Sequence, residues 1–342
     1  MRPVAALLAG LLFLAPLPLA AAECVGQNLI AQLSPEVRAE LDAAVAPVPY
    51  HKGTFWQATR GSSKIVLLGT YHFGDDRHAT TITTFAPEID GAQKLLVEAG
   101  PKEQAQLQNS LKDDPSLITD AKGPTLPERM EKADWDKLSK AMSERGIPSF
   151  VASRMRPWYV AMMMGLSPCM IDEAKKAGLP EGLDELVMRR AEAHGVPIEA
   201  LEPWDTVFRM FAGMSPTEEI EMLRSSLPAA EHADDYATTL IDAYFKGDIW
   251  EIWEFGRFDA YANSGMTRAD VDEQMKIAQD KMMDRRNQSW IGPLEAAAQE
   301  AAGNGGYVVA AFGALHLPGE AGVLRLLERD GWTVTALPSP HS

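Results

Sequence analysis

Two stretches of this chain share one pattern, a short apolar run that stops at glycine and is followed three residues later by histidine. Residues 64–69 lead to His72, and residues 307–313 lead to His316. Short apolar runs rich in β-branched residues and ended by glycine are typical of strands buried in a sheet. Because the two stretches lie near opposite ends of the chain, we expect one central sheet to which both ends contribute.

The remaining sequence predicts further strands and a largely helical middle. Residues 94–97, 196–201 and 332–336 have the composition of strands, and an amphipathic helix is expected over 321–329. Apolar residues at spacings of three and four predict helices over 134–145, 158–164, 183–193, 216–223 and 233–245. Proline and charge clusters indicate surface loops over 113–127 and 225–235.

The predicted fold class is therefore α/β (α+β). It has a mixed central β-sheet built from N- and C-terminal strand-Gly-x-x-His halves, with a large helical insertion at approximately residues 102–300. The chain has 342 residues, which is enough for a sizeable core, and we expect a single domain over residues 23–342.

The first 22 residues have the features of a secretory signal peptide. A basic start is followed by an apolar run over residues 4–19 and by alanines at 20–22, so we expect cleavage near Ala22 and a secreted or periplasmic protein. The run is short for a bilayer crossing, which disfavours a retained anchor. Glu23 stands before Cys24 where a lipoprotein needs a small residue, so lipidation is not expected.

The charge balance of the whole sequence limits the partners of the protein. Lys and Arg total 32 against 48 Asp and Glu, a formal net charge of −16, so a polyanion is repelled and nucleic acid is not an expected partner. No later apolar stretch approaches the roughly 20 residues of a membrane-spanning helix, so no transmembrane segment is expected in the mature chain. Nothing in the sequence indicates an oligomeric state.

The chain has two cysteines, Cys24 and Cys169. In an oxidising exported compartment a disulfide between them is allowed, and two free thiols are the alternative. Neither cysteine lies beside a histidine or in a Cys-x-x-Cys pair, so a catalytic thiol is not expected.

Three residues with metal-binding side chains follow the ends of predicted strands. His72 and His316 follow the two glycine corners, and Glu98 ends the strand over 94–97. Strand ends in open α/β folds tend to bind ligands, and an imidazole–carboxylate–imidazole set is a common ligand set for a catalytic divalent ion. The alternative is that each histidine is a purely structural residue, at a helix cap or in the core, since a single Gly-x-x-His tetrapeptide occurs by chance.

Several motifs resemble the TraB/GumN family, whose relatives include the animal Tiki proteins and, further away, ChaN-like haem-binding and erythromycin-esterase-like proteins. The resemblance covers nearly all of the mature chain, and its most specific part is the C-terminal block around His316-Leu317-Pro318-Gly319-Glu320. The other matching motifs are Gly69-Thr70-Tyr71-His72, Leu96-Val97-Glu98, Gly182-Leu183-Asp184, Leu201-Glu202-Pro203 and Arg286-Asn287 ahead of Trp290.

The resemblance implies roles for five residues. Tiki proteins are regarded as metal-dependent proteases that need both Gly-x-x-His motifs and an acidic residue, which implies that His72, Glu98 and His316 hold the metal. Arg286 would then grip a carboxylate or stabilise an oxyanion in the same cleft, and Asn287 would orient the substrate. Without the family, Arg286 and Asn287 read equally well as an exposed helical turn.

Glu202 is a candidate general base or a partner of a histidine. The alternative for Glu202 is a charge at the start of the helix that follows.

The expected function is that of an exported metal-dependent hydrolase acting on a peptide or amide bond, with a divalent ion of the Zn, Mn or Co type and Glu98, Glu202, Arg286 and Asn287 as further catalytic candidates. Its partner would be a peptide or small-molecule substrate. One alternative is a periplasmic protein that binds haem, metal or a protein without catalysis. Another is a metal-independent esterase-like enzyme in which His and Glu act as acid and base.

Overall fold

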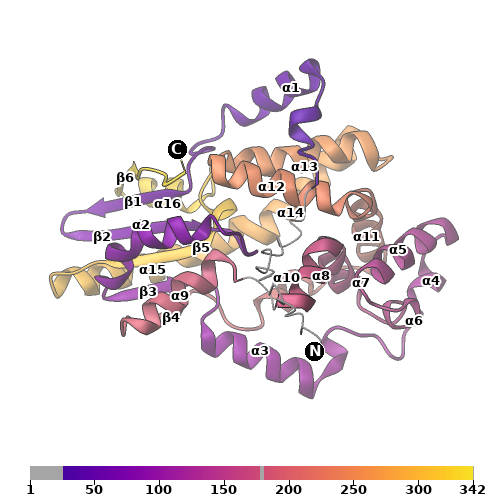
Figure 1. Cartoon of the computed structure of the whole chain (residues 1–342), viewed down its shortest axis with the longest axis horizontal. Helices are drawn as coiled ribbons and strands as arrows, with labels where there is room; N and C mark the ends of the chain where they lie inside the picture. The colour runs from indigo at the N-terminus through magenta and orange to yellow at the C-terminus, as the bar shows by residue number, and fades with distance from the viewer. Residues whose placement is uncertain (1–25, 178–180, 342) are drawn as a thin grey trace, which may run out of the picture.

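The computed structural model describes residues 26–177 and 181–341, in which six strands form one mixed sheet (Figure 1). The predicted signal peptide and Cys24 lie outside the described residues, and Cys169 is not a free thiol.

Across the sheet the strand order is β4-β3-β5-β2-β1-β6. The strands are β1 (Phe55–Arg60), β2 (Ser63–Thr70), β3 (Lys94–Val97), β4 (Ile198–Ala200), β5 (Val308–Gly313) and β6 (Thr333–Ala336).

The strand from the C-terminal end of the chain occupies the centre of the sheet. β5 lies between β3 and β2 and runs parallel to both. Ala310 of β5 is opposite Leu67 of β2, and Ala311 of β5 is opposite Val97 of β3. β4 extends this parallel group beyond β3, whereas β1 runs antiparallel to β2 and to β6. The predicted fold class is confirmed: both ends of the chain build a mixed sheet, and a long helical stretch separates them.

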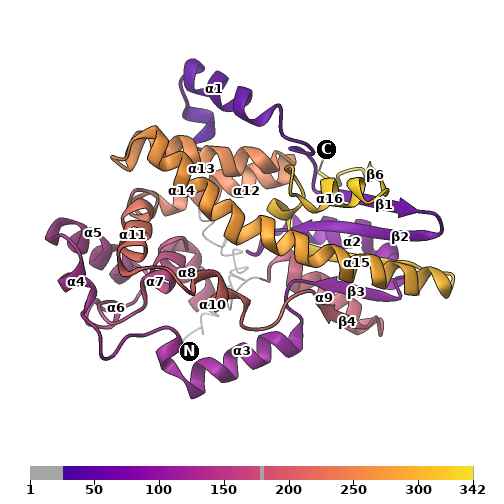
Figure 2. The same ribbon diagram turned by 180° about the vertical axis from the view of Figure 1, so that it is seen from behind.

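Helices cover both faces of the sheet because its central strands are apolar on both sides. Val66 and Leu68 of β2 face the layer of α2 (His78–Asp90) and α9 (Leu183–Ala193). Ile65 and Leu67 alternate with them and face α15 (Arg285–Gly303) and α16 (Val323–Arg329). Figures 1 and 2 show these two layers from opposite sides. Each such buried side chain contributes roughly 1.5–3 kcal/mol of transfer free energy.

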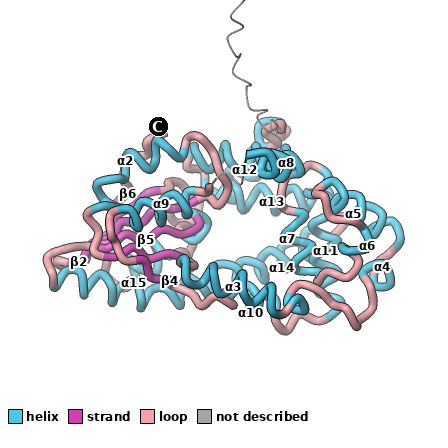
Figure 3. Tube along the Cα trace, turned by 60° about the horizontal axis from the view of Figure 1, so that its bottom comes forward, coloured by secondary structure: helices cyan, strands magenta, loops and turns pink. Residues whose placement is uncertain are grey.

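The other helices surround the sheet or form a second group beyond its edge. Leu138, Met142, Met164, Leu223 and Leu227 from three of these helices form a separate apolar core. The helices are α1 (Pro35–Val45), α3 (Pro101–Asp113), α4 (Leu126–Arg129), α5 (Lys132–Glu144), α6 (Ser149–Ala152), α7 (Pro157–Met164), α8 (Pro168–Ala177), α10 (Thr206–Phe211), α11 (Pro216–Glu231), α12 (Ala233–Lys246), α13 (Ile249–Asn263) and α14 (Arg268–Gln279). Figure 3 shows the group of α4, α5, α6, α7 and α11 on the side of the molecule opposite the sheet.

The helices expected in the middle of the chain are present, but one expected loop is not. Residues 225–231 continue α11 through Pro228, and α12 begins at Ala233, so the loop prediction over 225–235 was wrong. A proline removes one helical hydrogen bond, here the bond to the carbonyl of Arg224, and Arg224 is an exposed residue. Within the described ranges, no helix is long and apolar enough to cross a membrane.

The parallel strands end at the edge of the sheet that faces the middle of the molecule. In Figure 1 the β1–β2 turn lies at the far left, so the carboxyl ends of β2, β5 and β3 point towards α10 and α12. The strand ends that the sequence singled out therefore share one edge.

Candidate active site

His72, Glu98 and His316 converge beside Gly313. β2 ends at Thr70 two residues before His72, Glu98 directly follows β3, and a short 3-10 turn, η4 (Ala314–His316), carries His316 after β5. A Cβ atom added to Gly313 would lie 3.2 Å from Glu98 Oε1, 3.3 Å from His72 Nε2 and 3.6 Å from His316 Cδ2. One small volume, kept open by the missing side chain of Gly313, is thus bounded by all three.

His72 is oriented by a carboxylate from α9. Its Nδ1 donates to Asp184 Oδ2 at 2.9 Å, which leaves Nε2 directed at the volume beside Gly313. Partial desolvation lowers the pKa of His72, but the hydrogen bond and charge of Asp184, together with the charge of Glu98, raise it to about 9. The ring is 60% exposed, so it is reachable from solvent.

Glu98 is held by two donors. The Gly313 N–H donates to its Oε1 at 2.7 Å, and Arg286 Nη2 donates to its Oε2 at 2.6 Å. Burial raises the pKa of this carboxyl. His316, in its protonated form at low pH, the charges of Arg286 and His72, and the Gly313 N–H lower it, so that it lies at about 2. Glu98 is therefore ionised at neutral pH and is a weak base.

His316 is buried and neutral. Its Nδ1 donates to Asn287 Oδ1 at 2.6 Å, so its Nε2 carries the lone pair that accepts from Arg286 Nη1 at 3.2 Å. Burial lowers the pKa of His316, and although Glu98 raises it, Arg286 and His72 lower it further, to about 3. The ring also packs against Trp290, with 4.5 Å between the centroids.

Arg286 donates hydrogen bonds to Glu98, Glu202 and His316 and so links them in one network. Its Nε and Nη2 form a fork on Glu202, at 2.7 Å to Oε1 and 2.9 Å to Oε2, and Trp290 Nε1 also donates to Glu202 Oε1 at 3.0 Å. The guanidinium lies on the face of Trp290, 5.2 Å from the ring centroid. The cation is thus fixed by two carboxylates, Glu98 and Glu202, on one side of the site.

All six residues singled out by the sequence lie in or beside this network: His72 borders the volume beside Gly313, and the other five are linked by hydrogen bonds. Asn287 is buried and donates to the Ala321 carbonyl at 2.9 Å while it accepts from His316, so it orients a histidine. The exposed-turn alternative for Arg286 and Asn287 is wrong, because Arg286 is 16% exposed and Asn287 is buried. Glu202 is a partner of Arg286 and Trp290 rather than of a histidine.

Sequence reasoning missed Asp184 as a site residue. It lies in the first turn of α9 and accepts from Thr70 Oγ1 as well as from His72. The one signal available was its place in the Gly182-Leu183-Asp184 motif, which resembles family positions. In contrast, His78, which follows the charged loop after His72, is a fully buried core histidine whose Nε2 donates to the Phe73 carbonyl at 3.0 Å.

In the described part of the chain, no three His, Cys, Asp or Glu side chains are already arranged to hold a metal ion. The distance from His316 Nε2 to Glu98 Oε1 is 3.9 Å, and both groups are turned towards Arg286. The guanidinium of Arg286 thus donates to His316 Nε2 and to the carboxylate of Glu98, which are the groups that would bind a metal ion.

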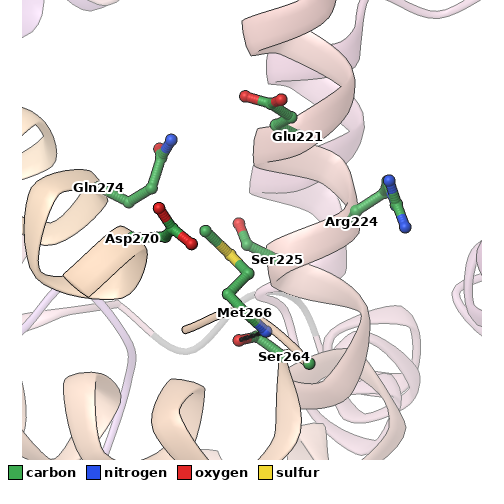
Figure 4. Close-up of a pocket in the computed structure, with 8 residues that line it drawn as sticks. Glu221, Arg224, Ser225, Ser264, Met266, Asp270 and Gln274 are labelled. Carbon is green, nitrogen blue, oxygen red and sulfur yellow. Dashed lines mark hydrogen bonds between the residues drawn. The ribbon is translucent and has the colours of Figure 1, made fainter. Parts of the chain in front are cut away.

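A cavity of about 410 Å³ lies elsewhere, between α11 and the α13–α14 connection (Figure 4). Glu221, Arg224 and Asp270 are among its lining residues, and Arg224 also pairs with Asp134 at 2.9 Å. None of its lining residues belongs to the site, so the cavity is not part of the network around Gly313.

The fold and the site define an α/β protein with two strand-end histidines around one carboxylate. The sequence matches the profile of the TraB/PrgY/gumN family over residues 54–336, a range that contains all strands of the sheet and all residues of the site. The chain belongs to this family. Neither the comparison with curated proteins nor that with solved structures finds a match to the chain.

Proposed function

We propose that this protein is an exported, metal-dependent hydrolase that cleaves a peptide or amide bond. The observation that carries the proposal is the convergence of His72 Nε2, Glu98 Oε1 and His316 on the volume left open by Gly313. Family resemblance to the Tiki proteins supports the bond type, and the sequence of residues 1–22 supports export.

The donor set fits a divalent cation. Both histidines use Nδ1 for a protein acceptor, Asp184 for His72 and Asn287 for His316, an arrangement that leaves Nε2 for a ligand. Such partners of the second ring nitrogen are usual for histidines that bind metals. His72, Glu98 and His316 would hold the ion, with the His316–Arg286 hydrogen bond released. An ion of the Zn, Mn or Co type would supply a water nucleophile at neutral pH and polarise the scissile carbonyl.

Arg286 would stabilise negative charge that develops on the substrate. Glu202 holds its Nε and Nη2, so its position is fixed before the reaction. A preorganised cation beside the reacting carbonyl stabilises the oxyanion of the transition state more than the ground state. Glu202 is then a positioning residue for Arg286.

A second candidate is a metal-independent esterase-like enzyme, which one observation favours. Arg286 already donates to Glu98 and to His316 Nε2, so the site has a cation without an added ion. In this case protonated His72, with its pKa at about 9, would act as the general acid that gives a proton to the leaving group.

Metal content and hydrolysis measured together test both proposals. The mature chain would be purified, its bound metals quantified by mass spectrometry, and fluorogenic peptide and ester libraries assayed with and without EDTA. We expect a stoichiometric ion, loss of peptide hydrolysis in EDTA, and at least a roughly 100-fold loss in His72→Ala, Glu98→Gln and His316→Ala. His232→Ala changes an exposed histidine outside the site and serves as the control.

The outcomes separate the functions. Hydrolysis that survives EDTA but is lost in His316→Ala favours the metal-independent enzyme. A tight metal or haem complex with no turnover in either library, and with no effect of EDTA on any assay, overturns both enzymatic proposals and leaves a binding protein.

A further inference from the structure

We propose that Asp184 is the positioning residue of His72, and that through it the start of α9 determines where His72 Nε2 points. The inference rests on the proposed function in one respect, namely that Nε2 of His72 is the atom used. Asp184 contacts the site through His72. Its side chain accepts hydrogen bonds from His72 and from Thr70, and it is not among the groups nearest the volume beside Gly313.

The carboxylate of Asp184 is fixed to the core of the sheet. One oxygen accepts from Thr70 Oγ1, and Thr70 is the buried last residue of β2. The other oxygen accepts from His72 Nδ1 at 2.9 Å. Because both oxygens are used, the carboxylate cannot rotate without losing a hydrogen bond, and it transmits the position of β2 to the imidazole.

The two histidines of the site need different means of orientation. The side chain of His316 is 7% exposed and is packed against Trp290, so its surroundings restrict its rotamer. The side chain of His72 is 60% exposed, so packing restricts it much less. The hydrogen bond to Asp184 therefore has the larger part in holding the ring of His72.

The backbone around Asp184 is tied to the loop that carries His72. The Leu183 N–H donates to the Tyr71 carbonyl at 2.9 Å, and Phe73 forms a β-bridge with Glu181. A Cβ atom on Gly182 would lie 2.3 Å from the His72 carbonyl oxygen, so only glycine permits this approach. The start of α9 thus lies alongside residues 71–73 and brings Asp184 to His72.

Three variants test the inference on the full mature chain. Asp184→Ala removes the carboxylate. Asp184→Asn keeps the shape, since its carbonyl can accept from His72 Nδ1 while its amide donates to Thr70 Oγ1. Glu185→Ala is the matched control, because Glu185 also lies in the first turn of α9 but accepts from Gln104 at 2.7 Å, away from the site.

The first measurement is calorimetric titration with Zn²⁺ alone. We expect Asp184→Ala to weaken Zn²⁺ binding by about 10- to 100-fold, the range found when groups behind metal ligands are removed. Asp184→Asn should recover part of this loss, and Glu185→Ala should bind as the unmodified protein does. Equal Zn²⁺ affinity in Asp184→Ala and the unmodified protein would overturn the inference.

The second measurement needs neither metal nor activity. In ¹⁵N-histidine-labelled protein at low temperature, the Nδ1–H of His72 should give a downfield signal, assigned by its absence in His72→Gln. This signal should be lost in Asp184→Ala and retained in Glu185→Ala. If the unmodified protein binds no Zn²⁺ and hydrolyses nothing, the proposed function fails, but a signal that depends on Asp184 still supports the positioning role.

A further variant, Thr70→Val, covers the case in which Asp184→Ala does not fold. Thr70→Val removes one of the two anchors of the carboxylate with little change in shape. We expect it to broaden or weaken the His72 signal and to weaken Zn²⁺ binding less than Asp184→Ala would. An unchanged signal together with unchanged Zn²⁺ affinity would show that the carboxylate is not fixed in the way proposed.

Discussion

Arg286 and Glu202 form a two-point ion pair, with Nε at 2.7 Å from Oε1 and Nη2 at 2.9 Å from Oε2. Both side chains are largely buried, at 16% and 8% exposed. The preceding residue, Arg285, is 72% exposed and pairs with Asp280 at 2.6 Å. Two adjacent arginines of α15 thus form ion pairs of similar length, one exposed to solvent and the other largely buried.

Arg286→Ala should strongly destabilise the protein. The substitution leaves the carboxylates of Glu98 and Glu202 without their cation, and loss of one partner of a buried pair costs about 3–5 kcal/mol. Arg285→Ala should cost about 0–1 kcal/mol, since exposed pairs contribute little. Urea denaturation followed by circular dichroism measures both free energies of unfolding. Similar losses in the two variants would contradict the prediction.

Asn287→Ala should cost about 1–3 kcal/mol, because it leaves His316 Nδ1 and the Ala321 carbonyl unpaired in the interior. Asn304→Ala, at the exposed C-terminal end of the same helix, is the control and should be nearly neutral. Thermal unfolding compares the two. A midpoint for Asn287→Ala as high as that of Asn304→Ala would show that the buried hydrogen bonds of Asn287 contribute little.

Gly313→Ala should block the site without removing any of its side chains. Gly313 has a φ of −48°, so alanine fits the backbone, but the added methyl would lie 3.2 Å from Glu98 Oε1 and 3.3 Å from His72 Nε2. We expect a loss of metal affinity and hydrolysis on the order of 10- to 100-fold, as for other disturbances around metal ligands. Gly256→Ala, where nothing lies within 4 Å of the added methyl, should leave both unchanged.

Stability should fall as the pH drops below about 6.5, and His316 should account for part of the loss. Its pKa is about 3 in the folded protein against an ordinary value of 6.5, so between these values the unfolded chain binds a proton that the folded protein does not. The slope from one such group approaches about 1.4 kcal/mol per pH unit. In EDTA, His316→Gln should have a flatter profile of unfolding free energy over this range than the unmodified protein. Parallel profiles would contradict the assignment of His316 as neutral.

The strands that matter for the site could be predicted because their local sequence is unambiguous. Residues 64–69 and 307–313 are almost continuously apolar, which suits strands covered by helices on both faces. β1 was missed because Gln57, Thr59 and Arg60 interrupt its apolar residues, and because its position depends on pairing with β2 and β6. A strand of mixed polar and apolar residues is specified by its neighbours more than by its own composition.

The convergence of the site residues was predictable in outline, but their partners were not. Parallel neighbours end at one edge, so His72, Glu98 and His316 were expected to meet there. The partners depend on contacts across the helical middle. The residue numbers of Asp184 and His72 differ by 112, and those of Glu202 and Arg286 differ by 84. No local pattern encodes such a pairing, which explains why Glu202 was considered a partner of a histidine and Asp184 was not considered.

The central position of β5 also bears on when the protein acquires its chemistry. β2 and β3 are not neighbours in the sheet, because β5 lies between them, and β5 follows the whole helical stretch in chain order. A growing chain, or one trimmed before residue 308, therefore contains His72 and Glu98 but no assembled centre. Any catalytic competence is therefore postponed until the helical stretch has been made and β5 has paired with both β2 and β3.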